Sequence, residues 1–133
     1  MILKQITVFA ENKCGGLIKI TELLAEGGVD MKALTIAETE EYGIVRIIAD
    51  DAEKAQIILE KNEIFCKLTD VIGVSIPHRP GGLNEVLSAL QGAKVNVEYL
   101  YAFLSAEGGA KVALRVDDNE KALAALKTAG FSR

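Results

Sequence analysis

The stretch NKCGGL, residues 12–17, recurs in altered form as HRPGGL, residues 78–83. In each copy a glycine pair stands directly before a helical apolar pattern. A glycine pair at this place opens backbone N–H groups at the start of a helix, where the helix dipole favours a negative charge. The sequence therefore predicts two related anion-binding turns, which form either two sites or two halves of one site.

The repeat extends along the whole chain of 133 residues. The offset of 66 positions that joins Gly15 to Gly81 also aligns four apolar pairs. These pairs are Leu17 with Leu83, Leu24 with Leu90, Val29 with Val95, and Leu34 with Leu100. Further on, an offset of 67 aligns DDAEKA (50–55) with DDNEKA (117–122). We expect two homologous domains, residues 1–69 and 70–133, which are small enough to require packing on each other for stability.

Charge and composition exclude several classes of function. Nineteen acidic and fifteen basic residues give a net charge of −4, and no lysine or arginine run is present, so a nucleic-acid partner is not expected. No apolar run is long enough to span a membrane and no secretory signal is visible, which favours a cytoplasmic protein. Cys14 and Cys66 lack metal-ligand spacing, so we expect reduced thiols, no metal site and no cofactor. Redox sensing at Cys14, near a helix start, is an alternative.

The hydrophobic period changes in the same order in both copies. Strands are expected where apolar residues alternate, and helices where they recur at i, i+3 and i+7. In the first copy the elements are a strand at 3–10, a helix from 17 to the Gly27–Gly28 pair, strands at 31–39 and 43–49, a helix at 50–62 and a strand at 65–69. In the second copy they are a strand at 70–77, a helix from 83 to Gly92, strands at 95–104 and 111–116, and a helix at 117–130.

This order, βαββαβ, is typical of a ferredoxin-like α+β fold with an antiparallel sheet and both helices on one face. The second unit lacks most of its last strand. The edge beside Val71–Ile76 should therefore be covered by the first unit or by another chain. Each second helix begins with an Asp followed three residues later by a Glu, which we interpret as a capping box and not as catalytic carboxylates.

Three aromatic residues, Tyr99, Tyr101 and Phe103, share one face of a predicted strand. Leu34 and Leu100 occupy equivalent positions of the two copies and are both leucine, so we assign their face of the strand to the helix-covered core. The aromatic residues then lie on the other face. Exposed aromatics at this place favour a dimer interface. A ligand wall is the second interpretation, and a pigment or nucleotide site the third.

The duplicated pattern resembles the ACT domain, a small-molecule-binding regulatory module. The resemblance lies in ENKCGGL (11–17), GGVDMKAL (27–34) and YGIVRIIADDAEKA (42–55), and it covers essentially the whole chain as a tandem pair. It is greatest to small stand-alone tandem ACT proteins that have no catalytic domain.

The resemblance implies that a free amino acid binds at the interface between two ACT units. The family pattern E-N-x-P-G-x-L falls on Glu11–Leu17, with Cys14 at the usual proline, and a second Asn motif falls on Asn96. Crossing the copies predicts one pocket with Asn12 and Asn96 and another with His78 and Asp30. The expected ligand-binding residues are Asn12, Lys13, Cys14, Gly15, Gly16, Leu17, Asp30, His78, Arg79, Pro80, Gly81, Gly82, Leu83 and Asn96.

We therefore expect a non-catalytic amino-acid sensor, a homodimer, which regulates an enzyme of amino-acid metabolism. An alternative is a regulatory subunit of an amino-acid biosynthetic enzyme, similar to the small subunit of acetolactate synthase. A third interpretation is an enzyme on a ferredoxin-like scaffold, similar to acylphosphatase, with Arg79 as an anion clamp. The third lacks a nucleophile or base set, since His78 is the only histidine.

Overall fold

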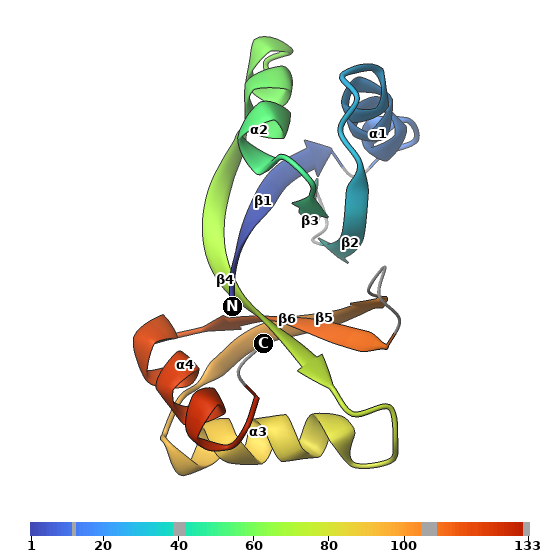
Figure 1. Cartoon of the computed structure of the whole chain (residues 1–133). Coiled ribbons are helices and arrows are strands. Elements are labelled where there is room, and N and C mark those ends of the chain that lie inside the picture. Colours follow the sequence, from blue (N-terminus) through green and yellow to red (C-terminus); the bar gives the residue numbers. More distant parts are fainter. Residues whose placement is uncertain (12, 39–41, 105–108, 132–133) are drawn as a thin grey trace. The chain divides into compact units, whose positions relative to one another are not determined.

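Four helices and six strands form the part of the chain that the structure, a computed structural model, describes: residues 1–11, 13–38, 42–104 and 109–131. They follow the predicted order (Figure 1). The elements are β1 (Ile2–Glu11), α1 (Gly16–Glu26), β2 (Met31–Glu38), β3 (Tyr42–Ala49), α2 (Ala52–Lys61), β4 (Cys66–Ile76), α3 (Gly82–Gly92), β5 (Val97–Leu104), β6 (Ala110–Val116) and α4 (Asn119–Thr128). The α+β class is thus confirmed.

The chain divides into two compact units. The N-terminal unit comprises residues 4–69, and the C-terminal unit comprises residues 1–3 together with 70–133. The strand order is β2-β3-β1-β4 in the first and β1-β4-β6-β5 in the second. The pairs β1·β3, β2·β3, β4·β6 and β5·β6 are antiparallel, as the ferredoxin-like plan requires.

Two predicted strands are in fact one. Residues 65–69 and 70–77 were expected as separate strands, whereas β4 is continuous from Cys66 to Ile76. Its first four residues close the N-terminal unit, and the rest opens the C-terminal unit. No turn residue separates the two halves, because Thr69 and Asp70 lie within the strand. The boundary between the repeats is therefore not a structural break.

The first three residues of the chain cover the open edge of the C-terminal unit. The Gly73 amide donates to the Met1 carbonyl at 2.8 Å, and the Met1 amino group donates to the Gly73 carbonyl at 3.4 Å. In the N-terminal unit the Phe9 amide donates to the Phe65 carbonyl at 3.2 Å. In an antiparallel pair the numbers of facing residues have a constant sum, and for Met1 with Gly73 and for Phe9 with Phe65 this sum is 74. Both contacts therefore belong to one antiparallel register of β1 with β4. A segment of the first sequence repeat thus replaces the missing last strand, which is one of the two predicted arrangements.

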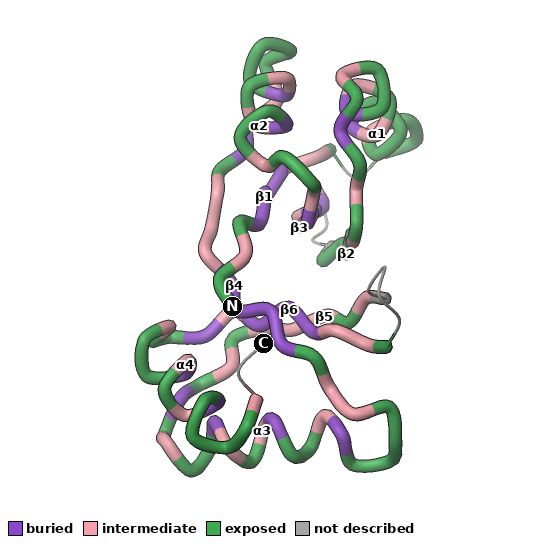
Figure 2. Tube along the Cα trace, in the orientation of Figure 1, coloured by how far each residue is buried: buried purple, intermediate pink, exposed green. Residues whose placement is uncertain are grey.

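Each unit has its own hydrophobic core between its sheet and its two helices. Ile6, Ile20 and Leu24 are fully buried in the N-terminal core, and Val86 and Leu90 in the C-terminal core. Buried positions recur at intervals of four residues along α3 (Figure 2). The apolar stripe predicted for each first helix therefore faces its sheet, except that the side chain of Leu17 stays 37% exposed.

The second helix of each unit is capped by the second aspartate of its acidic pair. Asp51 accepts a hydrogen bond from the Lys54 amide, and Asp118 accepts one from the Lys121 amide, each at 3.1 Å. The predicted capping box is wrong in detail, because the residue three places after the cap is a lysine and not a glutamate. A single side-chain cap is nevertheless present at each start.

The aromatic side chains of β5 are half-buried, not exposed. Register places Leu100 opposite Leu114, which lies in the C-terminal core, so the predicted core face of β5 is confirmed. In β2 the equivalent Leu34 lies opposite the core residue Ile47 but is 38% exposed. The repeat therefore predicted the correct face for Leu34, but this side chain is covered only in part.

Candidate functional site

The two glycine turns have the same backbone structure. Gly15 and Gly81 have φ values of +88° and +87°, a left-handed conformation that favours glycine. After each, the amide of the second glycine donates back, from Gly16 to Lys13 at 3.2 Å and from Gly82 to Arg79 at 3.1 Å. The turn predicted from the repeat is thus built twice from the same hydrogen bonds.

The second glycine of each pair is required by close backbone approach. A Cβ on Gly16 would lie 2.5 Å from the Glu11 carbonyl oxygen, and a Cβ on Gly82 would lie 2.2 Å from the Pro77 carbonyl oxygen. No side chain fits at either position without a shift of the backbone. The glycine pair therefore reflects two separate steric demands, a left-handed residue followed by a residue without Cβ.

The helices that follow these turns begin without a side-chain cap. No side chain accepts a hydrogen bond at Gly15 or Gly81, whereas α2 and α4 are both capped by aspartate. The first amides of a helix have no partner within it. The Gly16 and Gly82 amides already donate within the turns, so at α1 and α3 the amides of residues 17–18 and 83–84 are the ones open to an anion, such as a carboxylate, that approaches along the helix axis.

The predicted residues of each turn lie together. Lys13, Cys14 and Gly15 are exposed in the N-terminal unit, and His78 and Arg79 are exposed in the C-terminal unit. The remaining predicted turn residues are Gly16, Leu17, Pro80, Gly81, Gly82 and Leu83. Asn12 lies outside the described residues. In the C-terminal unit a depression of about 560 Å³ is lined by residues 76–84 and Ala110.

Ion pairs occupy the charged side chains of both turns. Lys13 Nζ lies 2.9 Å from Glu11 Oε2, and Lys13 holds the pKa of the Glu11 carboxyl below its ordinary value. The Arg79 guanidinium donates to both oxygens of Glu85, at 2.9 and 2.8 Å. Arg79 would have to leave Glu85 to act as the anion clamp of an acylphosphatase-like enzyme. The backbone amides are therefore the better hydrogen-bond donors to an anion.

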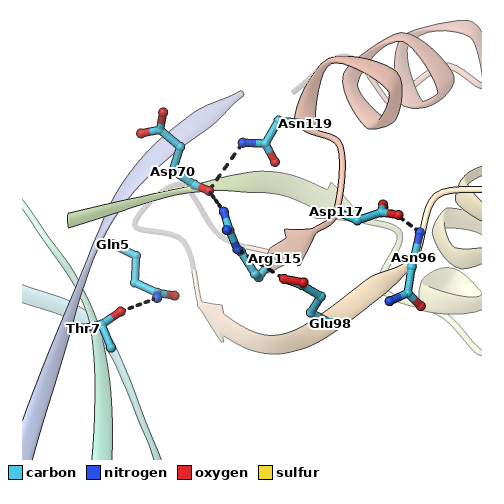
Figure 3. A network of polar contacts seen from close by, with 8 residues as sticks. All are labelled: Gln5, Thr7, Asp70, Asn96, Glu98, Arg115, Asp117 and Asn119. Carbon is cyan, nitrogen blue, oxygen red and sulfur yellow. Dashed lines mark hydrogen bonds and ion pairs between the residues drawn. The ribbon is translucent and has the colours of Figure 1, made fainter. Parts of the chain in front are cut away.

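Asp30 and Asn96 are placed by the first aspartate of each acidic pair. Asp50 accepts from the Asp30 amide at 3.0 Å. Asp117 accepts from the Asn96 amide, also at 3.0 Å (Figure 3). The exposed side chains of Asp30 and Asn96 take no part in these bonds. Sequence reasoning missed this role of the acidic pairs, in which one carboxylate holds the strand start and the other caps the helix.

Within one unit the turn and the strand start are far apart. Helix α3, Gly82–Gly92, stands between the turn and Asn96 in the chain, and its 11 residues at about 1.5 Å per residue give roughly 16 Å. Helix α1 has the same length between Gly16 and Asp30. The two predicted halves of a pocket therefore lie at opposite ends of each unit and do not meet there.

A polar cluster fixes the start of the C-terminal unit. The Asp70 carbonyl accepts from Arg115 at 3.3 Å and from Asn119 at 3.4 Å, and Arg115 lies 3.4 Å from the carboxylate of Glu98 (Figure 3). In the N-terminal unit Gln5 donates to the hydroxyl of Thr7 at 3.0 Å. Both clusters satisfy polar groups of the strands and lie away from the glycine turns.

The two cysteines lie in different surroundings. Cys14 is exposed in the first glycine turn, and Cys66 is buried in the N-terminal core, where burial raises the pKa of its thiol. No group of three His, Cys, Asp or Glu side chains within the described ranges could hold a metal ion. Among the helices described, none is long and apolar enough to cross a membrane.

Two tandem ferredoxin-like units, each with a glycine turn before its first helix, define a duplicated α+β fold. The chain belongs to the ACT family, since a family model described as an ACT domain pair matches residues 1–129. This confirms the family resemblance. No curated protein sequence matches the chain.

Similar solved structures cover nearly the whole chain. Protein BT0572 from Bacteroides thetaiotaomicron is 39% identical, with a TM-score of 0.90 over 96% of this chain and 88% of that one. The ligand-free regulatory subunit of aspartate kinase from Thermus thermophilus is 19% identical, with a TM-score of 0.65 over 96% and 93%. The Thermus flavus regulatory subunit gives 18% identity and a TM-score of 0.61 over 97% and 95%. The two Thermus structures share the fold of this chain. ACT domains are regulatory modules.

Proposed function

We propose that this ACT pair is a non-catalytic amino-acid sensor of the cytoplasm, which binds a free amino acid at its glycine turns and regulates a partner of amino-acid metabolism. The observation that carries the proposal is the pair of identical, uncapped helix starts after Gly15 and Gly81. The other two helices of the same chain are capped by aspartate, so the missing caps are specific to the turns.

The chemistry of an amino acid suits such a turn. Its carboxylate would accept hydrogen bonds from the first amides of α1 or α3, where the helix dipole also favours negative charge. Its ammonium group needs oxygen acceptors, which the side chains of Asp30 and Asn96 have. Because each of these lies a helix length from the turn of its own unit, we propose that an ACT unit of a second chain brings one of them to the turn. We keep Asn12, Asp30, His78 and Asn96 as the proposed side-chain ligands.

A regulatory role is supported by family membership. The regulatory subunits of aspartate kinase from two Thermus species share the fold of this chain. We therefore propose a regulated enzyme as the partner, and the aspartate kinase family is the first candidate to test by co-purification. A catalytic large subunit captured with the tagged chain would support a regulatory-subunit role over a free-standing sensor.

We also propose a homodimer. Strand β2 is an edge strand of the N-terminal unit, and on its helix side Leu34 and Ile36 are 38% and 48% exposed. Edge strands with exposed apolar residues favour pairing with a second chain. Light scattering would test this, with Ile36→Lys expected to give monomers and Ile57→Lys on α2 as the control.

Thermal unfolding with each of the twenty amino acids tests the main proposal. A ligand at a hundred times its Kd adds about 2.7 kcal/mol of stability, which is several degrees for a chain of this size. We expect one chemical class of amino acid to raise the midpoint. Asn12→Ala, His78→Ala and Asn96→Ala should reduce that rise, whereas Asn62→Ala, at the end of α2, should leave it unchanged. No rise with any amino acid would reject the sensor function of the isolated protein.

A further inference from the structure

An aromatic pair lies on the helix-free face of the N-terminal unit. Phe9 of β1 and Phe65, just before β4, are direct cross-strand neighbours, since the Phe9 amide donates to the Phe65 carbonyl at 3.2 Å. Their ring centroids are 5.4 Å apart, with the planes inclined by 45°. Phe9 is half-buried, and Phe65 is 68% exposed, the largest exposed fraction of any large apolar side chain in the described ranges.

The two rings line a hollow beside the first glycine turn. Its volume is about 330 Å³, and it is lined by Phe9, Ala10, Glu11 and Phe65. This is near the lower end of the size of small-molecule sites. The backbone of Glu11 also forms the turn, because its carbonyl accepts from the Lys13 amide at 2.9 Å. A ligand held at this turn therefore has an apolar surface next to it.

The fold itself does not require this pair. The offset of the repeat places Ser75 at the position of Phe9, and Pro77 at the position of Glu11. The C-terminal unit forms the same sheet with Ser75, paired with Lys111 of β6. The aromatic pair is thus a feature of one unit only, and it leaves a phenylalanine ring largely in water, which is unfavourable unless something covers it.

We infer that the hollow of Phe9 and Phe65 receives the aromatic side chain of an amino acid bound at the neighbouring glycine turn, which makes the N-terminal unit selective for phenylalanine, tyrosine or tryptophan. This inference rests on the function proposed above. A third ring can pack on two tilted rings edge to face, an arrangement more favourable than aliphatic contact of equal area. The ammonium group of Lys13 is paired with the Glu11 carboxylate at the rim, so it does not attract the side chain of aspartate or glutamate into the hollow.

Calorimetric titration of the full chain with L-phenylalanine, L-leucine and L-aspartate tests the selectivity. The variants are Phe65→Ala, at an exposed position that should not disturb folding, and Phe9→Ser, which introduces the residue of the other unit. Ile57→Ala, which truncates another exposed apolar side chain of the same unit, is the matched control. Saturation-transfer NMR with benzyl alcohol tests the hollow by itself, because this probe has a ring but no amino-acid backbone.

We expect L-phenylalanine to bind about tenfold more tightly than L-leucine, and both Phe variants to abolish this preference. The Ile57→Ala variant should keep the preference, and benzyl alcohol should bind only when Phe65 is present. L-Phenylalanine that binds with the same Kd to the original chain and to Phe65→Ala would overturn the inference and leave the proposed function intact. Binding of benzyl alcohol that depends on Phe65, without binding of any amino acid, would show that the hollow holds an aromatic ring but would overturn both the inference and the proposed function. Binding of neither would overturn both.

Discussion

The side chain of Leu3 lies over Gly73, where a Cβ would be only 2.6 Å from Leu3 Cδ1. Leu3 belongs to the first sequence repeat and Gly73 to the second, yet both lie in the C-terminal unit. We predict that Leu3→Ala lowers the free energy of unfolding by about 1–2 kcal/mol, because it removes partly buried apolar surface. Urea unfolding followed by circular dichroism would measure the loss. Ile2→Ala, at a 41% exposed position of the same segment, should cost less, and equal losses would contradict the packing role of Leu3.

The second glycine of each turn should not tolerate a side chain. Gly82→Ala would bring a Cβ within 2.2 Å of the Pro77 carbonyl oxygen, a rigid backbone atom. We expect a loss of about 1–3 kcal/mol from the resulting backbone shift, measured by urea unfolding. The control is Gly92→Ala in the same helix, where nothing lies within 4 Å of the added Cβ. This variant should be neutral or stabilising by up to about 1 kcal/mol, and a comparable loss there would contradict the steric explanation.

The residues that follow α1 and α3 provide a second matched pair. Gly28 and Lys94 are equivalent in the repeat, and both adopt left-handed φ, +73° and +60°. Only glycine takes this conformation without steric cost. Lys94→Gly should therefore raise the thermal midpoint, with a gain of about 1 kcal/mol, although it removes a charge. Gly28→Ala should lower the midpoint by a similar energy, and a stabilising Gly28→Ala would reject the argument.

The two thiols should differ strongly in reactivity. Cys14 is exposed and Cys66 is buried, so a thiol reagent such as DTNB should modify one cysteine per native chain and both only after denaturation. Cys14→Ser should abolish the native reaction, whereas Cys66→Ala should leave it unchanged. Rapid modification of both thiols in the native protein would show that the N-terminal core opens readily.

Stability should fall at alkaline pH because of Cys66. Burial, and to a lesser extent Glu60, raise the pKa of its thiol above the ordinary value of 9.0. The unfolded chain therefore releases this proton first as the pH rises, and the stabilisation is complete below pH 9.0 and is lost progressively above it. Urea midpoints measured from about pH 8 to about pH 11, a range that brackets ordinary thiol titration, would give the slope. The urea midpoint of Cys66→Ala should fall less steeply with pH over this range than that of the original chain. An unchanged slope would mean that other groups cause the loss of stability.

Much of the fold was predictable because its signals are local. The i, i+3, i+7 spacing of Leu83, Val86 and Leu90 depends only on helix geometry, and Val86 and Leu90 are buried as expected. The left-handed glycines at 15 and 81 follow from turn chemistry at a strand end. The site side chains assigned from family resemblance, Asn12, Asp30, His78 and Asn96, remain predictions.

The errors arise where local patterns are ambiguous. The acidic pairs indicated a helix start, but the spacing does not reveal that the two aspartates have different roles. Asp50 binds the amide at the strand start, and Asp51 caps the helix. The aromatic hollow was missed because Phe9 and Phe65 are 56 residues apart in the chain. The register of β1 against β4 makes them neighbours, and this register is not visible in either segment alone.

Local patterns along the chain indicate the order of the elements in each repeat, the two glycine turns and the family, because the period of apolar residues and the steric needs of glycine act between near neighbours in the chain. The folded chain adds three features that these patterns do not reveal: Met1–Leu3 close the C-terminal unit, Cys66–Ile76 is one strand, and Phe65 lies beside Phe9. The physical reason is that strand partners are chosen through backbone hydrogen bonds over long chain separations. Every residue except proline carries the same donor and acceptor, so the side-chain pattern of one strand does not specify its partner.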